Sequence, residues 1–247
     1  MAKLKTLENA LKTLNCFTYK NPSWGVRELG RETGLNHSVV YRILSTFEEF
    51  GYLRKSRFND KYELGFKHLE FAGLLQDNLN IPEVMQPKMK ELTDQIGEST
   101  VLTWLDGDEG VYINIIESAQ KVKFHESLGA RAPLVYGASH KIILAYLSEA
   151  DQDRIISFHL GEEEKAQNLK EELDALQTQG WAYSSGEYLD GVTAIAVPLY
   201  NRNEDIIGSL SIAGPSFRIP YEKSMEYLVL LQKTQEDLQH SLNRILF

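Results

Sequence analysis

The stretch of sequence that decides the fold of the first part of the chain is NHSVVYRILSTFEEFGYL, residues 36–53. Its apolar residues Val40, Leu44 and Phe47 recur at helical spacing, which predicts a helix with one buried face. Another face is small, polar and cationic, which suits a helix that enters a groove and forms hydrogen bonds. That face carries His37, Ser38, Tyr41, Arg42 and Ser45.

The segments before this stretch predict a helix-turn-helix. Residues 26–34, VRELGRETG, are expected to form a short helix that ends at Gly34, and Asn36 is a suitable N-cap for the next helix. Two helices joined by a tight turn form this motif, and the N-terminal residues of the second helix face base edges. An earlier helix is expected over residues 6–17, with an apolar stripe of Leu7, Ala10, Leu11 and Leu14.

Residues 51–65, GYLRKSRFNDKYELG, predict a two-stranded wing after the second helix. Strands are expected over residues 52–56 and 61–64, with a turn between them. Lysines and arginines on such a wing can contact phosphates, which position a protein on DNA without specifying sequence. The alternative interpretation is an ordinary solvated hairpin. The cations concerned are Arg54, Lys55, Arg57 and Lys61.

The distribution of charge predicts two domains with different partners. The chain has a net charge of −9, but residues 1–65 hold 11 Lys and Arg against 7 Asp and Glu, which gives +4 there and −13 in the remainder. A basic head suits phosphates, and an acidic body suits another kind of partner. The single cysteine, Cys16, is expected to pack in the interior, and its isolation indicates the reducing cytoplasm. Neither a membrane-spanning run nor a signal peptide is apparent, so no membrane partner is expected.

The rest of the chain predicts a linker helix and an α+β domain. Residues 66–80 form an apolar helix that is expected to pack against a second copy of the chain. Beyond it we expect helices over 83–97, 137–147, 169–180 and 221–246, with a short helix beginning at 151. Strands are expected within 100–117, over 121–127 and as a hairpin over 191–214. The predicted domains are 1–65 for the head, 66–81 for the linker and 82–247 for the body.

Five segments together identify a resemblance to IclR-type bacterial transcriptional regulators. They are ELGRETGLNHSVVYRILSTFEEFGYL, KYELG, GARAPLVYGASHKIILAYL, GWAYSSGEYLDGVTAIAVPLY and GSLSIAGPSFRI, in this order. The resemblance implies a winged helix-turn-helix joined to a GAF-like or PAS-like effector-binding domain with a mostly antiparallel sheet. It also implies a dimer, or a dimer of dimers, that binds a pseudo-palindromic operator. The usual effector of such proteins is a small organic acid or an aromatic compound.

The resemblance also implies a set of effector-binding positions. In relatives that bind small oxoacids, the matching positions are Gly137, Ala138, Ser139, Ser184, Ala194, Ser211 and Ala213. This chain departs from the family at His140, because a glycine usually precedes the lysine that is Lys141 here. Ser184 and Ala194 are also less polar than their counterparts, which favours a larger or less polar ligand.

The residues themselves favour a binding pocket rather than a metal or cofactor site. The segment YGASHK, residues 136–141, would place backbone N–H groups at a helix N-terminus, where they attract a carboxylate. Candidate apolar walls are Trp104, His125, Leu128, Trp181 and Tyr188, although a single aromatic of this kind is more often ordinary core. No Cys, His or Asp cluster with metal-ligand spacing accompanies His125 and His140. We therefore expect neither a metal nor a cofactor.

The sequence thus predicts a ligand-responsive DNA-binding regulator, either repressor or activator, and not an enzyme. The expected DNA contacts are Asn36, His37, Ser38, Tyr41, Arg42, Arg54, Lys55, Arg57 and Lys61. The alternative is a small-molecule-binding enzyme of unknown reaction, but G-x-S-x-G, H-E-x-x-H, phosphate-loop and Rossmann patterns are all missing from the sequence. An architectural DNA-binding protein is a further alternative, and the acidic body argues against it.

Overall fold

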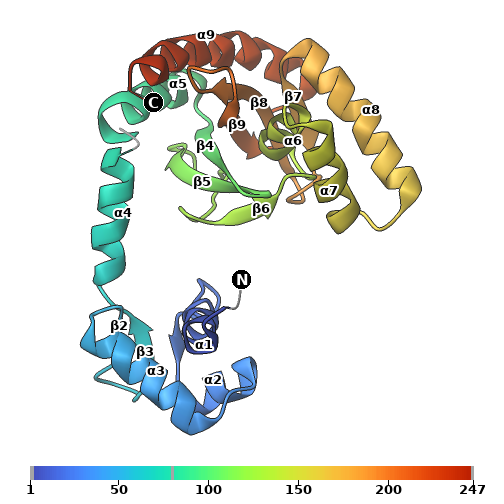
Figure 1. Ribbon diagram of the computed structural model, residues 1–247. Helices are drawn as coiled ribbons and strands as arrows, with labels where there is room; N and C mark the ends of the chain where they lie inside the picture. The colour runs from blue at the N-terminus through green and yellow to red at the C-terminus, as the bar shows by residue number, and fades with distance from the viewer. Residues whose placement is uncertain (1–2, 79–80, 246–247) are drawn as a thin grey trace. The chain divides into compact units, whose positions relative to one another are not determined.

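A computed structural model describes residues 3–78 and 81–245, and the chain divides into two units, Met1–Leu75 and Gln76–Phe247. The division falls within helix α4, Lys67–Asn78 (Figure 1). The domain boundaries expected from sequence, including the linker over 66–81, stay a prediction. Residues 1–2, 79–80 and 246–247 of those segments lie outside the described part of the chain.

The first unit is a winged helix-turn-helix, as predicted. Helix α2 ends at Gly34, whose φ of 69° is left-handed, and Asn36 is the N-cap of α3. The wing gains a strand that the sequence did not predict, because β1 pairs with β3 to give the order β1-β3-β2. The elements are α1 (Lys5–Leu14), β1 (Ser23–Trp24), α2 (Val26–Thr33), α3 (His37–Glu49), β2 (Leu53–Lys55) and β3 (Tyr62–Leu64).

The core of this unit is built around α3. Val40 and Leu44 are fully buried against Leu29 of α2 and Leu53 of β2, so the apolar face predicted for residues 36–53 is the buried one. Helix α1 is less buried than its stripe suggests. Its buried residue is Thr13, which donates a hydrogen bond to the Asn9 carbonyl, while Leu7 and Leu11 are exposed.

Helix α4 presents apolar side chains to solvent. None of its residues is buried, although the segment is rich in leucine and phenylalanine. Several exposed apolar side chains on one element are typical of an interaction surface. Its exposed apolar side chains, with that of the preceding residue, are Phe66, Leu69, Phe71, Leu74 and Leu75.

The second unit is an α+β domain around a six-stranded antiparallel sheet, as expected (Figure 1). The strand order is β6-β5-β4-β9-β8-β7. The strands are β4 (Ser99–Asp106), β5 (Glu109–Ile116), β6 (Arg131–Pro133), β7 (Ala182–Ser185), β8 (Val192–Tyr200) and β9 (Ile206–Pro215). The helices are η1 (Ile81–Met85, a π-helical turn), α5 (Gln86–Ile96), α6 (Ala138–Ala145), α7 (Glu149–His159), α8 (Glu163–Gln179) and α9 (Tyr221–Ile245).

The predicted strand over residues 121–127 is wrong. This segment has no regular structure and does not join the sheet. Its backbone is held by a side chain instead, because Ser99 Oγ donates a hydrogen bond to the Phe124 carbonyl at 3.3 Å. The Phe124 ring packs into a small buried cluster with Val101, Tyr112 and Ala213.

The two faces of the sheet differ in side-chain size. Because neighbouring residues of a strand point to opposite faces, the alternation along β8 and β9 separates large residues from small ones. Large residues, such as Ile195, Val197, Leu210 and Ile212, pack under α5 and α9. The opposite face, against which α6 packs, is built from small residues. These are Ala194, Ala196, Ser209, Ser211 and Ala213.

Candidate functional site

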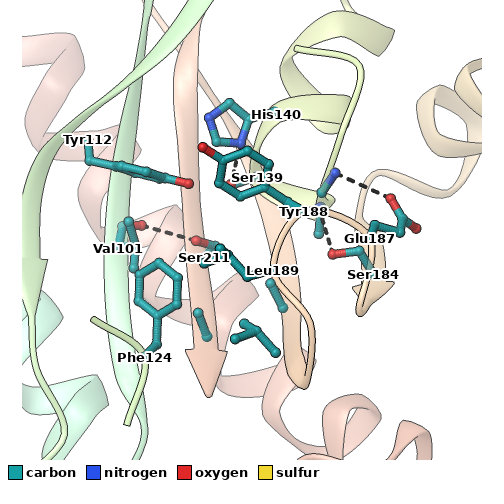
Figure 2. A pocket seen from close by; sticks show the side chains of 15 residues that line it. Val101, Tyr112, Phe124, Ser139, His140, Ser184, Glu187, Tyr188, Leu189 and Ser211 are labelled. Atoms are coloured by element: carbon teal, nitrogen blue, oxygen red, sulfur yellow. Dashed lines mark hydrogen bonds between the residues drawn. The ribbon is translucent and has the colours of Figure 1, made fainter. Parts of the chain in front are cut away.

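A cavity of about 30 Å³ lies between the small-residue face of the sheet and the N-terminus of α6 (Figure 2). That volume holds about one water molecule. Strands β4, β5, β7, β8 and β9, helix α6 and the segments before β6 and β8 contribute to the lining. Eight residues predicted from the sequence are in it: Gly137, Ala138, Ser139, Ser184, Tyr188, Ala194, Ser211 and Ala213. Their contact with a ligand stays a prediction.

Hydrogen bonds from two strands fix the position of α6. Its N-cap, Gly137, has a φ of 78°, a left-handed conformation that glycine adopts without strain. The Ala138 N–H donates to Ser184 Oγ of β7 at 2.8 Å, and Ser209 Oγ of β9 donates to the Ser139 carbonyl at 2.7 Å. All eight residues of α6 are buried. The first turn of the helix is therefore held directly over the sheet.

A carboxylate of the chain already lies at this helix N-terminus. The Gly137 N–H donates to Glu187 Oε2 at 3.3 Å, and Lys141 Nζ donates to Glu187 Oε1 at 2.9 Å. Lys141 is 4% exposed and forms a second ion pair with Glu172 of α8. Two of the N–H groups predicted to attract a ligand carboxylate are thus already hydrogen-bonded, that of Gly137 to Glu187 and that of Ala138 to Ser184.

Aromatic rings form the walls of the cavity. Tyr112 contacts Phe124 and His140 edge-to-face, with ring centroids 6.3 and 5.4 Å apart, and His140 also lies 6.1 Å from Tyr188. Figure 2 shows Tyr112 and Tyr188 reaching toward one another, with Ser211 and Phe124 beneath them. Burial raises the pKa of the Tyr112 hydroxyl far above its usual value. The walls are therefore uncharged at neutral pH.

His140 is the most unusual group in the lining. It is 1% exposed, and burial lowers its pKa to about 4, an effect that the Gly110 backbone partly opposes. Nδ1 lies 3.0 Å from Ser139 Oγ. Within residues 3–78 and 81–245, His140 Nε2 and Thr103 Oγ1 are the buried side-chain polar atoms without a well-formed hydrogen bond. A Cβ on Gly110 would lie 2.5 Å from His140 Cδ2, so the imidazole fits only because residue 110 is glycine.

Four predicted wall residues, Trp104, His125, Leu128 and Trp181, do not line the cavity. Trp104 packs against the core on the opposite face of the sheet, where Trp181 also lies. His125 is exposed and its Nδ1 lies 2.6 Å from Glu117 Oε1, and Leu128 is exposed as well. Strand alternation could have placed Trp104, because it shares its face with Leu102 and not with Val101.

Part of the lining was not predicted from the sequence. Tyr112 and Val101 follow the strand alternation that would have indicated them, but the rest depend on tertiary contacts. In particular, nothing near Glu187 in the sequence indicates that its carboxylate turns back to Gly137. The missed lining residues are Val101, Tyr112, Phe124, His140, Glu187, Leu189 and Val192.

In the first unit, the N-terminal part of α3 presents unpaired polar side chains. Each of the five residues predicted to contact DNA here is exposed, and Asn36 makes no side-chain capping bond. In the part of the chain that the structure describes, none of these side chains forms a hydrogen bond or ion pair, so all are available to a partner. They are Asn36, His37, Ser38, Tyr41 and Arg42.

The cations of the wing are mostly paired with acidic residues. Arg54 lies 3.0 Å from Glu63, and Lys55 lies 3.0 Å from Asp60. Lys61 Nζ lies 2.9 Å from Glu28, which also accepts a hydrogen bond from the Gly25 N–H, so this pair joins the wing to the start of α2. Arg57 has no ion pair among the described residues. Exposed pairs of this kind are weak and can exchange for phosphates.

The described residues contain no group of three or more His, Cys, Asp or Glu side chains placed to hold a metal ion. They also contain no helix of the length and apolar character needed to cross a membrane.

Comparison with known proteins places both units. Residues 6–57 match the model of the IclR helix-turn-helix domain, and residues 74–240 match that of the bacterial transcriptional regulator IclR C-terminal domain. The HTH-type transcriptional regulator KipR of Bacillus subtilis is 33% identical over 230 residues, which cover 89% of this chain and 91% of KipR.

Two solved structures show the same fold over almost the whole chain. An IclR family transcriptional regulator from Brucella abortus is 24% identical, with a TM-score of 0.79 over 97% of this chain and 92% of that one. An IclR homolog from Microbacterium hydrocarbonoxydans, complexed with 4-hydroxybenzoate, is 18% identical. Its TM-score is 0.81 over 97% of this chain and all of that one, 100%.

Proposed function

The chain belongs to the IclR family of bacterial transcriptional regulators, and from this membership we propose that a small molecule in its cavity controls binding to paired DNA half-sites. The family consists of regulators and not of enzymes, so the alternative of an enzyme is set aside. The observation that carries the proposal is the cavity, which adjoins a helix N-terminus and is lined by aromatic and serine side chains. The site of action is the cytoplasm, where the DNA is.

In this proposal the N-terminal residues of α3 enter the major groove. Arg42 and Tyr41 are exposed one helical turn after the N-cap, and Asn36, His37 and Ser38 lie beside the backbone N–H groups that attract phosphate. Arg57, together with Arg54, Lys55 and Lys61, contacts phosphates from the wing.

The proposed assembly is a homodimer, or a dimer of dimers, with the exposed apolar side chains of α4 at the interface. Burial of these side chains against a second copy removes them from water, which favours association. A dimer presents two copies of α3 to a pseudo-palindromic operator. The effector alters the spacing between those copies and so changes the affinity for paired half-sites.

The proposed effector is a small organic acid or an aromatic compound. Tyr112, Phe124 and Tyr188 supply flat apolar walls, and Ser139 and Ser211 supply hydroxyl groups. The 4-hydroxybenzoate bound by the Microbacterium homolog combines both features, an acid group and a ring. Because the cavity holds only about one water molecule, the ligand must displace part of the lining as it binds.

Selection of genomic DNA fragments tests this function. The purified protein is mixed with fragments of its source genome at physiological salt, and the bound fragments are sequenced. Salt is held constant because affinity for phosphate depends steeply on it. A few enriched fragments that share an inverted repeat are the expected result. No enrichment, with or without cell extract as a source of effector, contradicts the proposal.

Two substitutions separate the two sites. Arg42→Ala should weaken binding to the selected fragments and leave the response of the second unit to effector intact. Ser211→Val should fill the small cavity with little overpacking and abolish the response, with DNA binding unchanged. If a folded Ser211→Val protein keeps the response, the cavity is not the effector site.

A further inference from the structure

The segment between β7 and β8 places an acidic side chain where a ligand carboxylate would bind. Glu187, which Figure 2 shows in the lining, accepts hydrogen bonds from the Gly137 N–H at 3.3 Å and from Lys141 Nζ at 2.9 Å, the latter outside that view. We propose that Glu187 is a built-in occupant of a carboxylate position, and that the effector is a carboxylic acid whose carboxylate takes its place. This inference rests on the proposed role of the cavity as the effector site.

Lys141 explains why a carboxylate is needed at this position. Its side chain is 4% exposed, and a charged lysine buried to that degree requires acidic partners. It has two, Glu172 on α8 and Glu187, but only Glu187 lines the cavity. An incoming carboxylate that replaced Glu187 would therefore keep the charges around Lys141 balanced.

The lining offers no cationic side chain to balance a second anion beside Glu187. None of the lining residues is a lysine or arginine, and Glu187 is the acidic one among them. Glu126 is also close enough to raise the pKa values of Tyr112 and Tyr188. A ligand carboxylate added to this set would meet like charge, so exchange with Glu187 is the favourable route.

His140 lies beside the part of the cavity that Glu187 borders. Its imidazole lines the cavity and packs against Tyr112 and Tyr188, while its Nε2 lies toward the backbone of Gly110, outside the lining. Movement of Glu187 would open the cavity beside this ring.

The position of Glu187 in the chain makes the exchange possible at low cost. Residues 186–191 have no regular secondary structure, and Gly186 and Gly191 bound the segment with φ values of 70° and 72°. The Glu187 side chain is 36% exposed, so it can leave Lys141 for water. Because Tyr188 and Leu189 also line the cavity, a shift of this segment would enlarge it. The outward movement of Glu187 thus couples acid binding to cavity opening.

Acetate is the probe for this inference, because it resembles the end of the glutamate side chain. Glu187→Ala vacates the position, so acetate should raise the melting temperature of this variant by about 3 °C, while the neutral isostere acetamide should not. Glu187→Gln keeps the side-chain volume without the charge, and its gain should be smaller. The wild-type protein should gain least, because Glu187 competes with acetate. Chloride at equal ionic strength controls for salt.

Glu172→Ala is the matched control variant. It removes the other carboxylate on Lys141, but Glu172 does not contact the Gly137 N–H and does not line the cavity. Its response to acetate should equal that of the wild type. If Glu187→Ala fails to fold, the comparison of Glu187→Gln with the wild type still decides the question. Equal responses of all folded variants would overturn the inference.

Operator binding distinguishes this inference from the proposed function. Suppose that acetate raises the melting temperature of Glu187→Ala but does not change its affinity for operator DNA. This result would support the carboxylate position and overturn the regulatory role of the cavity. No gain with acetate, together with a lost effector response in Ser211→Val, would overturn the role of Glu187 and retain the proposed function.

Discussion

Each unit of the chain contains a histidine packed against a glycine, and the two pairs have almost the same geometry. A Cβ on Gly30 of α2 would lie 2.5 Å from Cδ2 of His37, and a Cβ on Gly110 of β5 would lie 2.5 Å from Cδ2 of His140. Their surroundings are opposite. His37 is exposed at the N-terminal end of α3, whereas His140 is buried between Tyr112 and Tyr188.

The comparison of the two pairs indicates that a close contact limits which substitutions are tolerated only where neither partner can move. An exposed imidazole can rotate into water at little cost, but a buried one displaces its neighbours. The same distinction applies to the ion pairs. The wing pairs are exposed and exchangeable, while Lys141 is enclosed by its partners. Substitutions in the two units should therefore differ in effect even where the distances agree.

The largest expected effect is the pH dependence due to His140. Its pKa is about 4 in the folded protein, against about 6.5 for an unfolded histidine. Between these values the unfolded state binds the proton and the folded state does not, so stability rises with pH from 4 to 6.5. The neutral state of His140 contributes roughly 3 kcal/mol to the free energy of unfolding. This contribution is fully present above pH 6.5 and is lost as the pH falls toward 4.

Urea unfolding between about pH 4 and pH 7 measures this dependence. The variant His140→Asn does not titrate, so it should show a shallower rise in the free energy of unfolding over the same range. Parallel curves for the two proteins would mean that another group is responsible.

Gly110→Ala should have the next largest effect. The added methyl group meets His140 at 2.5 Å and Thr103 Cγ2 at 2.9 Å, and the free energy of unfolding should fall by about 2 kcal/mol. The double variant Gly110→Ala with His140→Ala should lose less free energy of unfolding than the two single variants lose together, because the added methyl group no longer meets an imidazole. Additive effects in urea unfolding would show that the two residues are not coupled.

Gly30→Ala should change stability by about 1 kcal/mol or less. The methyl group improves helix propensity in α2, and His37 can turn away into solvent, although the Leu35 carbonyl lies 3.2 Å from the added atom. The displaced imidazole should instead weaken operator binding. Fluorescence anisotropy with the selected DNA measures this effect, with His37→Ala in both backgrounds as the control. A large loss of stability would remove the contrast with Gly110.

The smallest effect is expected for Glu63→Gln on the wing. The exposed pair with Arg54 contributes no more than about 0.5 kcal/mol to stability, but its loss frees a cation for phosphate. Affinity for DNA should rise, and it should fall more steeply with salt. Lower affinity in the variant would mean that Glu63 positions Arg54 for its contact.

The fold could be predicted where local patterns decide it. The periodicity of residues 36–53, the glycine after α2 and the antiparallel hairpin of β8 and β9 all appear in the sequence. Residues 121–127 were misassigned because a side chain, Ser99, satisfies the Phe124 carbonyl and no strand is needed.

The candidate site was predictable only in part. Gly137 and Ser211 were found through the family resemblance, and strict alternation along β4 would have excluded Trp104. Glu187 could not be found, because its contact with Gly137 joins residues 50 positions apart through an irregular segment. Contacts of this kind depend on the assembled sheet and leave no local pattern.

The alternation of large and small residues along β8 and β9 also separates two demands on the sequence. Stability depends on the face that carries Ile195, Val197 and Ile212, whereas the room left for a ligand depends on Ala194, Ser211 and Ala213. One set can vary while the other is conserved, even though the residues are interleaved. Conservative substitutions at the small positions should therefore change the volume of the cavity more than they change the core under α5 and α9.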